Sequence, residues 1–555
     1  MKETGATIIV RLLEKKGISV VSGIPGSANL PLYDALYHSS MRHVLARHEQ
    51  GAGFIAQGMA RSTGQAAVCI ATSGPGATNL LTAIADAKMD SVPLVAFTGQ
   101  VSTHLIGTDA FQEVDTYGLT IPITKHNFLV RSARELLDVV PLAFYLAESG
   151  RPGPVLIDVP KDVQLQEVEV KHWPTFLKPD KRKAPNETSL KAAADLLNAA
   201  ERPLLLVGAG VAESESTALV RQLVEQLQLP VATTLRGLGI VSPSHPLNLG
   251  MIGMHGTQYA NLLTEEADVV LALGVRFDDR ATGNVCSFCR MATLIHVDID
   301  KAEIDKIKPS HLSLEADLHS FLKQLYPLMV QRLRSSWCER IAELKLARPF
   351  VPIPPDADFF HPLQFIREVA AQLPEDAIIT TDVGQHQMWV AQAYPFMQPR
   401  TFLTSSGLGT MGFGLPAAIG AALAHPNRRV VCFSGDGSLL MNIQELATLA
   451  ELRVPVTILL FNNGHLGLVR QQQALFYERH FMASTFETLP DFPAIARGFG
   501  IQAYDLSTAE NPAALLAEAL SASVPTLINI PIDPDALVMP MVPPGASNQN
   551  MIIQH

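Results

Sequence analysis

Cysteine is scarce in this sequence, and the scarcity excludes a disulfide framework as the basis of the fold. Only five cysteines occur in 555 residues, far fewer than a chain held together by cross-links would carry. The one closely spaced pair, Cys286 and Cys289 in CSFC, has no second pair to complete a zinc or redox centre. We therefore expect buried apolar cores to stabilise the chain.

An excess of positive charge and a long apolar run are missing as well. The chain carries 42 Lys and Arg against 53 Asp and Glu, a net charge of −11, which argues against a nucleic-acid or anionic-membrane partner. The longest apolar stretch, residues 408–424, is rich in glycine and too short to span a bilayer. The first residues enter a helical pattern and show no signal-peptide core. We expect a cytoplasmic protein with no nucleic-acid or membrane partner.

What the sequence does contain is enough material for several packed domains. Hydrophobic residues make up 47% and charged residues 17%, so several cores can be buried. Apolar runs that end in Gly, Ser, Thr or Pro alternate with helical stretches, the pattern of parallel βαβ units. Two stretches without periodicity, 171–189 and 347–360, interrupt this alternation. The sequence predicts an α/β fold of three doubly wound parallel-sheet domains, at 1–170, 190–345 and 360–535, and a tail at 536–555.

The first chemical signal is SGDGSLLMN at residues 434–442, which follows the strand-like run RVVCF. Asp436 stands between Gly435 and Gly437 at the predicted end of the strand, and a helical pattern follows. Glycine lets the backbone approach a ligand closely, and the start of a helix offers free N–H groups to an anion. The same residues also fit a tight turn in which the aspartate caps the helix. The motif alone therefore does not distinguish a ligand site from a structural turn.

Asn463 separates the two interpretations. It ends the next strand-like run, VPVTILLFNN, 27 residues after Asp436. A strand, a helix and a second parallel strand take about 30 residues, so the two side chains are expected at adjacent strand ends. Asp and Asn oxygens with a backbone carbonyl suit Mg²⁺, and phosphate oxygens can complete its shell. The spacing predicts a metal site that also receives a phosphate.

GDGS…NN resembles the diphosphate motif of thiamine diphosphate (ThDP) enzymes. A second element agrees with it: RHEQGAGFIAQGMAR carries Glu49 in the context of the family's glutamate, which contacts the aminopyrimidine ring and promotes removal of the C2 proton. In order along the chain, GIPGS, SGPGATN, GTDAFQEVDTYG, TKHNFLV, GVRFDDR, TTDVGQHQMW and MVPPGASN are similar to segments of the catalytic subunits of acetohydroxyacid (acetolactate) synthases. The resemblance covers the whole chain.

The resemblance implies a role for particular residues of the third domain. Asp436, Asn463 and the backbone carbonyl of His465 would hold Mg²⁺, and Met411 would wedge beneath the cofactor as a catalytic residue. The residues it assigns to ThDP are Val383, Gly384, Gln385, His386, Gly409, Met411, Gly435, Asp436, Gly437, Ser438, Met441, Asn463, His465, Leu466, Gly467 and Leu468.

In the first domain the resemblance implies a reacting centre around the catalytic Glu49. The other first-domain residues that it brings to that centre are Gly26, Gln100, Phe111 and Lys125.

The middle domain contains VGAGVAE, which is a weak dinucleotide fingerprint because Glu213 occupies the place of its third glycine. A nicotinamide dehydrogenase would need a better one. The resemblance implies instead an extended FAD without net redox work, and it gives Arg280 the catalytic role of binding the carboxylate of the acceptor. The residues that it assigns to FAD are Arg151, Gly208, Ala209, Gly210, Thr234, Leu235, Gly253, Met254, His255, Gly274, Val275, Arg276, Asp278, Arg280, Asp298, Ile299 and Asp317.

The implied reaction decarboxylates pyruvate on ThDP and joins the hydroxyethyl unit to a second 2-oxo acid, pyruvate or 2-oxobutyrate. The product is 2-acetolactate or 2-aceto-2-hydroxybutyrate, at the first common step of branched-chain amino-acid biosynthesis. Gln472 departs from the family members that prefer 2-oxobutyrate, which carry a tryptophan there. One methylene in an apolar pocket is worth about 1–3 kcal/mol, so we expect little preference between the two acceptors.

Glu49 and Asp436 lie on different predicted domains, and in the family they meet across a subunit interface. The resemblance therefore implies a homodimer or tetramer, with a small regulatory subunit as a further partner. Two alternatives stay open: a ThDP- and FAD-dependent pyruvate oxidase or decarboxylase, and a non-catalytic assembly subunit with the same fold. The intact Glu49, Asp436 and Asn463 argue against the second alternative.

Overall fold

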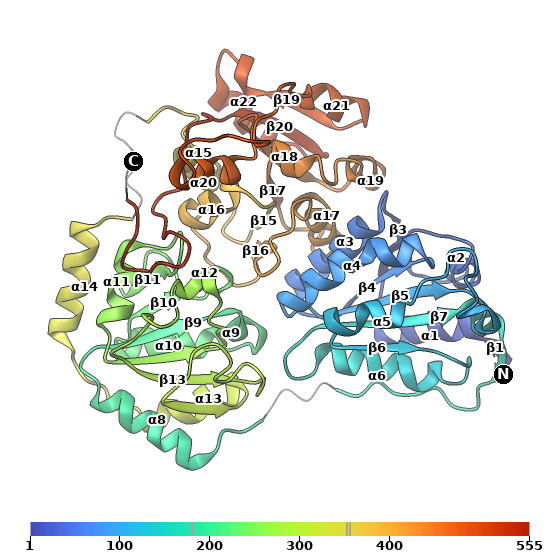
Figure 1. The fold of residues 1–555 in the computed structure, drawn as a ribbon, viewed down its shortest axis with the longest axis horizontal. Helices are drawn as coiled ribbons and strands as arrows, with labels where there is room; N and C mark the ends of the chain where they lie inside the picture. The colour runs from blue at the N-terminus through green and yellow to red at the C-terminus, as the bar shows by residue number, and fades with distance from the viewer. Residues whose placement is uncertain (1, 179–182, 351–352, 354–356, 554–555) are drawn as a thin grey trace.

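Three lobes, each built around a six-stranded parallel sheet, form the chain. The structure is a computed structural model, and it describes residues 2–178, 183–350, 353 and 357–553. In Figure 1 the lobes meet around a common centre, with the first lobe in blue, the middle lobe in green and the third lobe in orange to red. The predicted α/β class with three parallel-sheet domains is confirmed. Parts of both predicted linkers, 179–182 and 351–352 with 354–356, lie outside the described residues.

The first lobe orders its sheet β3-β2-β4-β5-β7-β6, and β1 pairs antiparallel with β8 beside it. All seven residues of β5 and all seven of β7 are buried, as expected for a parallel sheet covered on both faces. Its elements are β1 (Lys2–Thr4), α1 (Gly5–Lys16), β2 (Val20–Gly23), α2 (Leu30–Tyr37), β3 (Arg42–Leu45), α3 (Glu49–Thr63), β4 (Ala67–Ala71), α4 (Pro75–Met89), β5 (Leu94–Gln100), α5 (Thr116–Thr120), β6 (His126–Leu129), α6 (Leu136–Glu148), β7 (Pro154–Pro160), α7 (Lys161–Leu165) and β8 (Glu167–Glu169).

The middle lobe orders its sheet β11-β10-β9-β12-β13-β14. The weak fingerprint falls where β9 ends, and the helix that follows has only five residues. The elements are α8 (Glu187–Ala199), β9 (Pro203–Val207), α9 (Ala209–Glu213), α10 (Thr217–Leu227), β10 (Val231–Thr233), β11 (Asn248–Met251), α11 (Gln258–Glu266), β12 (Val269–Leu273), α12 (Asp279–Thr282), β13 (Thr293–Asp298), β14 (Leu312–Glu315), α13 (Leu318–Leu325) and α14 (Ser335–Ala347).

The third lobe orders its sheet β16-β15-β17-β18-β20-β19. The helix expected directly after GDGS is split into the short α18 and the longer α19. The elements are α15 (Pro362–Ala371), β15 (Ile378–Thr381), α16 (Gln385–Ala393), β16 (Phe402–Leu403), α17 (Gly414–Ala424), β17 (Val430–Gly435), α18 (Asp436–Leu439), α19 (Glu445–Leu452), β18 (Val456–Asn462), α20 (Gly467–Phe476), α21 (Phe492–Gly498), β19 (Gln502–Asp505), α22 (Pro512–Ser521) and β20 (Thr526–Pro531).

Two glycines allow α3 of the first lobe to cross α17 of the third at very short range. A Cβ on Gly420 would lie 1.9 Å from the carbonyl oxygen of Ile55, and a Cβ on Gly58 would lie 2.1 Å from that of Ala417. Only residues without a side chain fit so close an approach. One buried apolar cluster consequently runs through both lobes, and Glu49, at the start of α3, is carried on this crossing.

The predicted tail leaves the third lobe and lies against the middle lobe. The Val542 N–H donates to the carbonyl of Met254 at 2.8 Å, and the Asn548 side chain donates to the carbonyl of Ala281 at 2.9 Å. The tail is therefore an ordered extension that reaches the segment preceding and following Arg280. Among the residues described, none of the helices combines the length and apolar character needed to cross a membrane.

Candidate functional site

Asp436 and Asn463 lie side by side at adjacent strand ends, as their spacing predicts. Strands β17 and β18 pair in parallel, with Gly435 opposite Phe461. Asp436 is the first residue of α18, and its Oδ2 accepts the backbone N–H of Asn463 at 3.2 Å and that of Gly464 at 2.6 Å. The carboxylate therefore holds the turn after β18 in place through its backbone.

The Asn463 side chain is oriented by its neighbours. Its Nδ2 donates to Oε1 of Gln385 at 3.3 Å, while its Oδ1 accepts the N–H of His465 at 3.0 Å. Gly467 is required behind them, since a Cβ there would lie 2.1 Å from Oε1 of Gln385. The arrangement gathers a carboxylate, a carboxamide oxygen and a sharply turned backbone within one small corner.

The chemistry of this corner fits a divalent cation and a phosphate. Burial raises the pKa of Asp436 to about 6, so a cation beside it would restore the charged form that burial opposes. Burial lowers the pKa of His386 to about 3, which keeps the ring neutral, and its buried Nε2 has no hydrogen-bond partner among the described residues. His386 lines the same cavity, so its free ring nitrogen is available for a hydrogen bond with a bound ligand.

A cavity of about 170 Å³ opens at this edge of the third sheet. Of the sixteen residues that the resemblance assigns to ThDP, only Met441 does not line it, and its side chain is 54% exposed. The residues that do line it are Val383, Gly384, Gln385, His386, Gly409, Met411, Gly435, Asp436, Gly437, Ser438, Asn463, His465, Leu466, Gly467 and Leu468.

Glu49 lies at the carboxyl edge of the first sheet and does not line this cavity. Its carboxylate is nearly buried and accepts a hydrogen bond from Nδ2 of Asn79 at 2.9 Å. Thr72, which follows β4, lies close to both Gly26 and Gly76, and the space beside Gly76 also contains Oε1 of Glu49. Glu49 and Gly26 therefore lie at one edge of the first lobe, and neither lines the cavity that contains Asp436.

Gln100 ends β5 at the same edge, and all of its amide atoms are used. Its Nε2 donates to Oδ2 of Asp158 and to the carbonyl of Val114, both at 3.0 Å, and its Oε1 accepts the N–H of Val101. Burial raises the pKa of Asp158 to about 7. Sequence reasoning missed Asp158, since a lone Asp inside the apolar run VLIDVP looks like an ordinary strand residue.

Phe111 lies beside that edge, since the backbone of the next residue, Gln112, is close to Gly74 at the start of α4, whereas Lys125 is held elsewhere. The Phe111 side chain is 85% exposed, and the ammonium of Lys125 donates to the carbonyls of Leu146 and Ser149 near the end of α6. Burial lowers the pKa of Lys125 to about 8. Neither residue lines a cavity with Asp436 in this chain.

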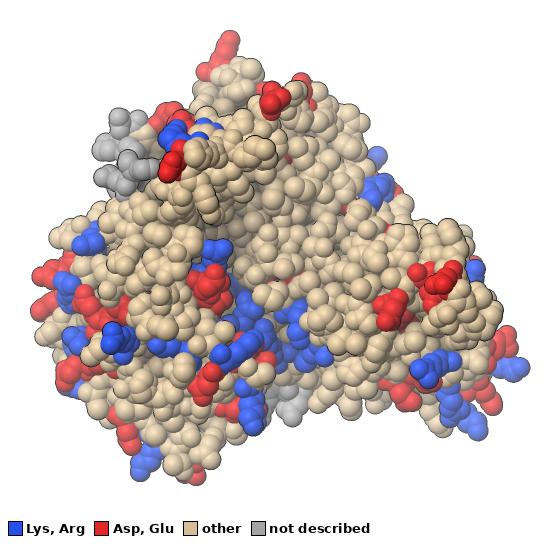
Figure 2. Space-filling model, viewed as in Figure 1, with Lys and Arg blue, Asp and Glu red and all other residues tan. Residues whose placement is uncertain are grey.

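A second and larger cavity, of about 570 Å³, lies where the three lobes meet. The surface is hollowed there, and Lys and Arg gather where the first and middle lobes adjoin (Figure 2). Gly208 and Gly253 stand behind its wall, where a Cβ would lie 2.2 Å from the carbonyl oxygen of Gly274 and 2.1 Å from that of Arg280. The residues predicted for FAD that line it are Arg151, Ala209, Gly210, Thr234, Leu235, Met254, His255, Gly274, Val275, Arg276, Asp278, Arg280, Asp298, Ile299 and Asp317.

Arg280 and Gln472 both line the larger cavity, although they come from different lobes. The guanidinium of Arg280 is largely exposed; its Nη1 lies 3.4 Å from Sδ of Met254. Gly409, Val383 and Leu468 line both cavities. The predicted acceptor site thus lies next to the corner that holds Asp436.

Two further residues of the smaller site escaped sequence reasoning. Asp382 is fully buried and its Oδ1 accepts the N–H groups of Gly412, at 2.7 Å, and Val383, at 3.1 Å. Gln471 accepts a hydrogen bond from Nε2 of Gln385 at 3.0 Å. Asp382 follows a predicted strand in TTDVG, as Asp436 does in SGDGS, so its position could have marked it as a site residue. No local pattern marks Gln471, because its hydrogen-bond partner Gln385 is 86 residues away.

Family models match each lobe. The N-terminal TPP binding domain, the central domain and the C-terminal TPP binding domain of thiamine pyrophosphate enzymes match residues 3–119, 190–325 and 382–530. These matches follow the three lobes in order, and they include the segments that carry Glu49 and Asp436.

Curated relatives match nearly the entire chain. It is 55% identical over 550 residues to the acetolactate synthase isozyme 1 large subunit of Escherichia coli (strain K12), across 99% of this chain and 97% of the relative. It is 45% identical to the isozyme 2 large subunit of the same organism, across 99% of both chains. It is 43% identical to the acetolactate synthase large subunit of Lactococcus lactis (strain IL1403), across 100% of this chain and 96% of the relative.

Replacement of Asp436 tests the metal corner. In Asp436→Asn the charge is lost, and an amide NH₂ takes the place of an oxygen, so we expect the dissociation constant for Mn²⁺ in the presence of ThDP to rise about tenfold or more. Electron paramagnetic resonance of free Mn²⁺ measures it. Asp535→Asn, an exposed carboxylate of the same lobe, should leave the constant unchanged. Equal Mn²⁺ affinity of Asp436→Asn and the unmodified chain would contradict the assignment.

Proposed function

The chain belongs to the family of acetolactate synthase large subunits, which are thiamine pyrophosphate enzymes, and we propose that its two cavities divide this reaction between them. It is a ThDP-dependent carboligase with the acetolactate synthase role in branched-chain amino-acid biosynthesis. The observation that carries the proposal is the contact between cavities: the corner of Asp436 adjoins the space lined by Arg280 and Gln472. We propose domain bounds of 1–170, 190–345 and 360–535, with a tail at 536–555, and a cytoplasmic location.

The smaller cavity is the proposed site of the diphosphate and its metal ion. Asp436, Asn463 and the carbonyl of His465 supply hard oxygen ligands of the kind that Mg²⁺ prefers. His386 supports the proposal with its unpartnered Nε2, and Met411 lines the same cavity. When bound, ThDP would supply a nucleophilic carbon and a thiazolium ring that takes up the electrons released by decarboxylation. The protein's role in this cavity is to hold that carbon in one place.

Glu49 is proposed to hold and move the proton of the aminopyrimidine ring. A glutamate that is 9% exposed and keeps one hydrogen bond, from Asn79, has an oxygen left for such a partner. Because Glu49 does not line the cavity that contains Asp436 in the same chain, we propose that a second copy supplies it. The minimum assembly is then a homodimer, with a tetramer and a small regulatory subunit as further forms.

The larger cavity is proposed to receive FAD and the acceptor 2-oxo acid. Its volume of about 570 Å³ is in the range of cofactor sites, and its arginines suit the phosphates of a dinucleotide. Arg280 offers a planar guanidinium to the acceptor carboxylate. The same walls restrict water near the reacting carbon, which limits protonation before the acceptor arrives. The flavin is proposed to act as a structural element.

The product of pyruvate turnover tests the proposed function. We expect the purified protein with pyruvate, ThDP, Mg²⁺ and FAD to form a product that yields acetoin only after treatment with acid, at constant dissolved oxygen. Acetaldehyde as the main product would favour a decarboxylase, and oxygen loss matching pyruvate loss would favour an oxidase. Binding of ThDP without any consumption of pyruvate would favour the non-catalytic assembly subunit.

Complementation between two inactive chains tests the shared site. We expect Glu49→Gln and Asp436→Asn each to be inactive alone, and a purified heterodimer of the two, isolated by different tags, to regain about half of the activity because one of its two sites is intact. If Glu49 and Asp436 served the same site within one chain, the heterodimer would stay inactive. The two homodimers, prepared in the same way, are the controls.

Gln472 tests acceptor specificity. Competition between pyruvate and 2-oxobutyrate should show little preference in the unmodified protein, since no ring packs on the extra methyl group. Gln472→Trp should raise the preference for 2-oxobutyrate about tenfold or more, as the burial of one methylene allows. Gln472→Leu, apolar but without a ring, is the matched control and should change the ratio much less. An unmodified protein that already strongly prefers 2-oxobutyrate would overturn this assignment.

A further inference from the structure

The segment Thr404–Thr410 forms a wall that both cavities share. Ser405, Ser406, Gly407, Leu408 and Gly409 line the larger cavity. Gly409 and Met411, which directly follows the segment, line the smaller one. A change in the position of this wall on one side therefore moves residues that face the other side.

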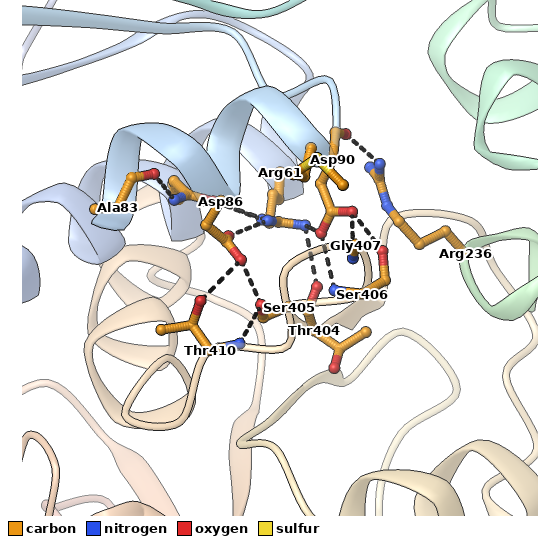
Figure 3. A network of polar contacts seen from close by, with 12 residues as sticks. Arg61, Ala83, Asp86, Asp90, Arg236, Thr404, Ser405, Ser406, Gly407 and Thr410 are labelled. Carbon is orange, nitrogen blue, oxygen red and sulfur yellow. Dashed lines mark hydrogen bonds and ion pairs between the residues drawn. The ribbon is translucent and has the colours of Figure 1, made fainter. Parts of the chain in front are cut away.

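Two buried carboxylates of the first lobe hold the wall from behind (Figure 3). Asp90 accepts the backbone N–H groups of Ser406 and Gly407, both at 2.9 Å, and also the Ser406 hydroxyl. Asp86 accepts the hydroxyl of Ser405, whose oxygen in turn accepts the N–H of Thr410 at 2.8 Å. Consecutive residues of the wall are thus fixed by one turn of α4 and its end.

Arg61 balances the two carboxylates. Its Nη2 lies 2.7 Å from Asp86 and its Nη1 lies 2.9 Å from Asp90, and Nη1 also donates to the carbonyl of Thr404 at 3.1 Å. All three charged side chains are buried. Burial works against the charged form of Asp90, but the neighbouring guanidiniums of Arg61 and Arg236 hold its pKa well below the usual value. Such a buried network specifies one geometry more effectively than it adds stability.

The middle lobe joins the same network from the side of the larger cavity. Arg236 lines that cavity and donates to the main-chain carbonyl of Asp90. Arg276, which also lines it, donates to the neighbouring carbonyl of Met89. A ligand that orders these two arginines therefore acts on the end of α4, which holds the wall.

We propose that Arg61, Asp86 and Asp90 couple the two cavities, so that flavin bound in the larger cavity tightens the binding of ThDP and Mg²⁺ in the smaller one through the segment Thr404–Thr410. None of the three lines either cavity, so they are positioning residues. The inference rests on the proposed function, and it gives a flavin without redox work a definite role, which is to fix the wall that ends at Met411. Coupling of this kind is reciprocal, so ThDP must tighten flavin binding by the same factor.

Measured dissociation constants test the coupling directly. ThDP is titrated by calorimetry at saturating Mg²⁺ with and without saturating FAD, and FAD is titrated by its fluorescence with and without ThDP. In the unmodified protein we expect each ligand to lower the dissociation constant of the other by about fivefold or more. The coupling factor is a ratio, so a uniform loss of affinity does not change it.

Variants of the network should reduce that factor to near one. Ser406→Ala removes the hydroxyl that Asp90 accepts, and Ser406→Thr keeps one and should retain the coupling. Asp86→Asn, outside both cavities, removes a charge that pairs with Arg61 at constant shape. Ser62→Ala is the matched control, because Ser62 is a buried hydroxyl next to Arg61 that bonds only to carbonyls of its own helix. It should leave the factor unchanged.

The outcomes separate the inference from the proposed function. An unmodified protein that binds neither ThDP nor FAD would refute the proposed function. A protein that binds both without mutual effect would refute the coupling alone. Full coupling in Ser406→Ala, with only a lower midpoint of thermal unfolding, would also refute it by assigning the network a merely structural role. If Asp86→Asn does not fold, the comparison of Ser406→Ala with Ser406→Thr still tests the coupling.

Discussion

In the third lobe, the parallel pairing of β17 with β18 places the backbone N–H groups of Asn463 and Gly464 against the carboxylate of Asp436. The proposed metal corner of the smaller cavity depends on this contact. It fixes the turn from which the Asn463 side chain and the His465 carbonyl project, and Gly467 leaves room for Gln385 behind them. A buried carboxylate held by backbone donors is a firm anchor for a cation, since little rearrangement is needed on binding.

Residues of all three lobes line the larger cavity. The middle lobe supplies most of its wall, the first lobe contributes Arg151, and the third contributes Gln472 and the segment Thr404–Thr410. A site made from three lobes is sensitive to how those lobes are held together. The glycine-mediated crossing with α17 and the buried Arg61 both lie on α3, which begins at Glu49, while the partners of Arg61, Asp86 and Asp90, come from α4 and its end. The contacts that hold the first and third lobes together therefore also position residues of the proposed site.

Several site residues were predictable because their signal is local. GDGS, the NN that ends the following strand and the Glu in RHEQGAG lie at predicted element ends, where parallel sheets present ligands. The family resemblance extended this to most of the lining of the smaller cavity and to about half of the lining of the larger one. Met441, Gly208 and Gly253 stand in the predicted segments but line neither cavity, since the Met441 side chain is exposed and the two glycines pack against backbone.

The sequence by itself determined the three α/β units, their order, and the adjacency of Asp436 and Asn463, because strand periodicity and βαβ length are local properties of the chain. Only the tertiary structure decided that the segment Thr404–Thr410 lies between two cavities, that Arg61 lies between Asp86 and Asp90, and that Glu49 does not line the cavity of Asp436 within one chain. These relations join positions up to several hundred residues apart through burial and side-chain hydrogen bonds. No periodicity or spacing encodes such contacts, because their partners are brought together only when the lobes pack.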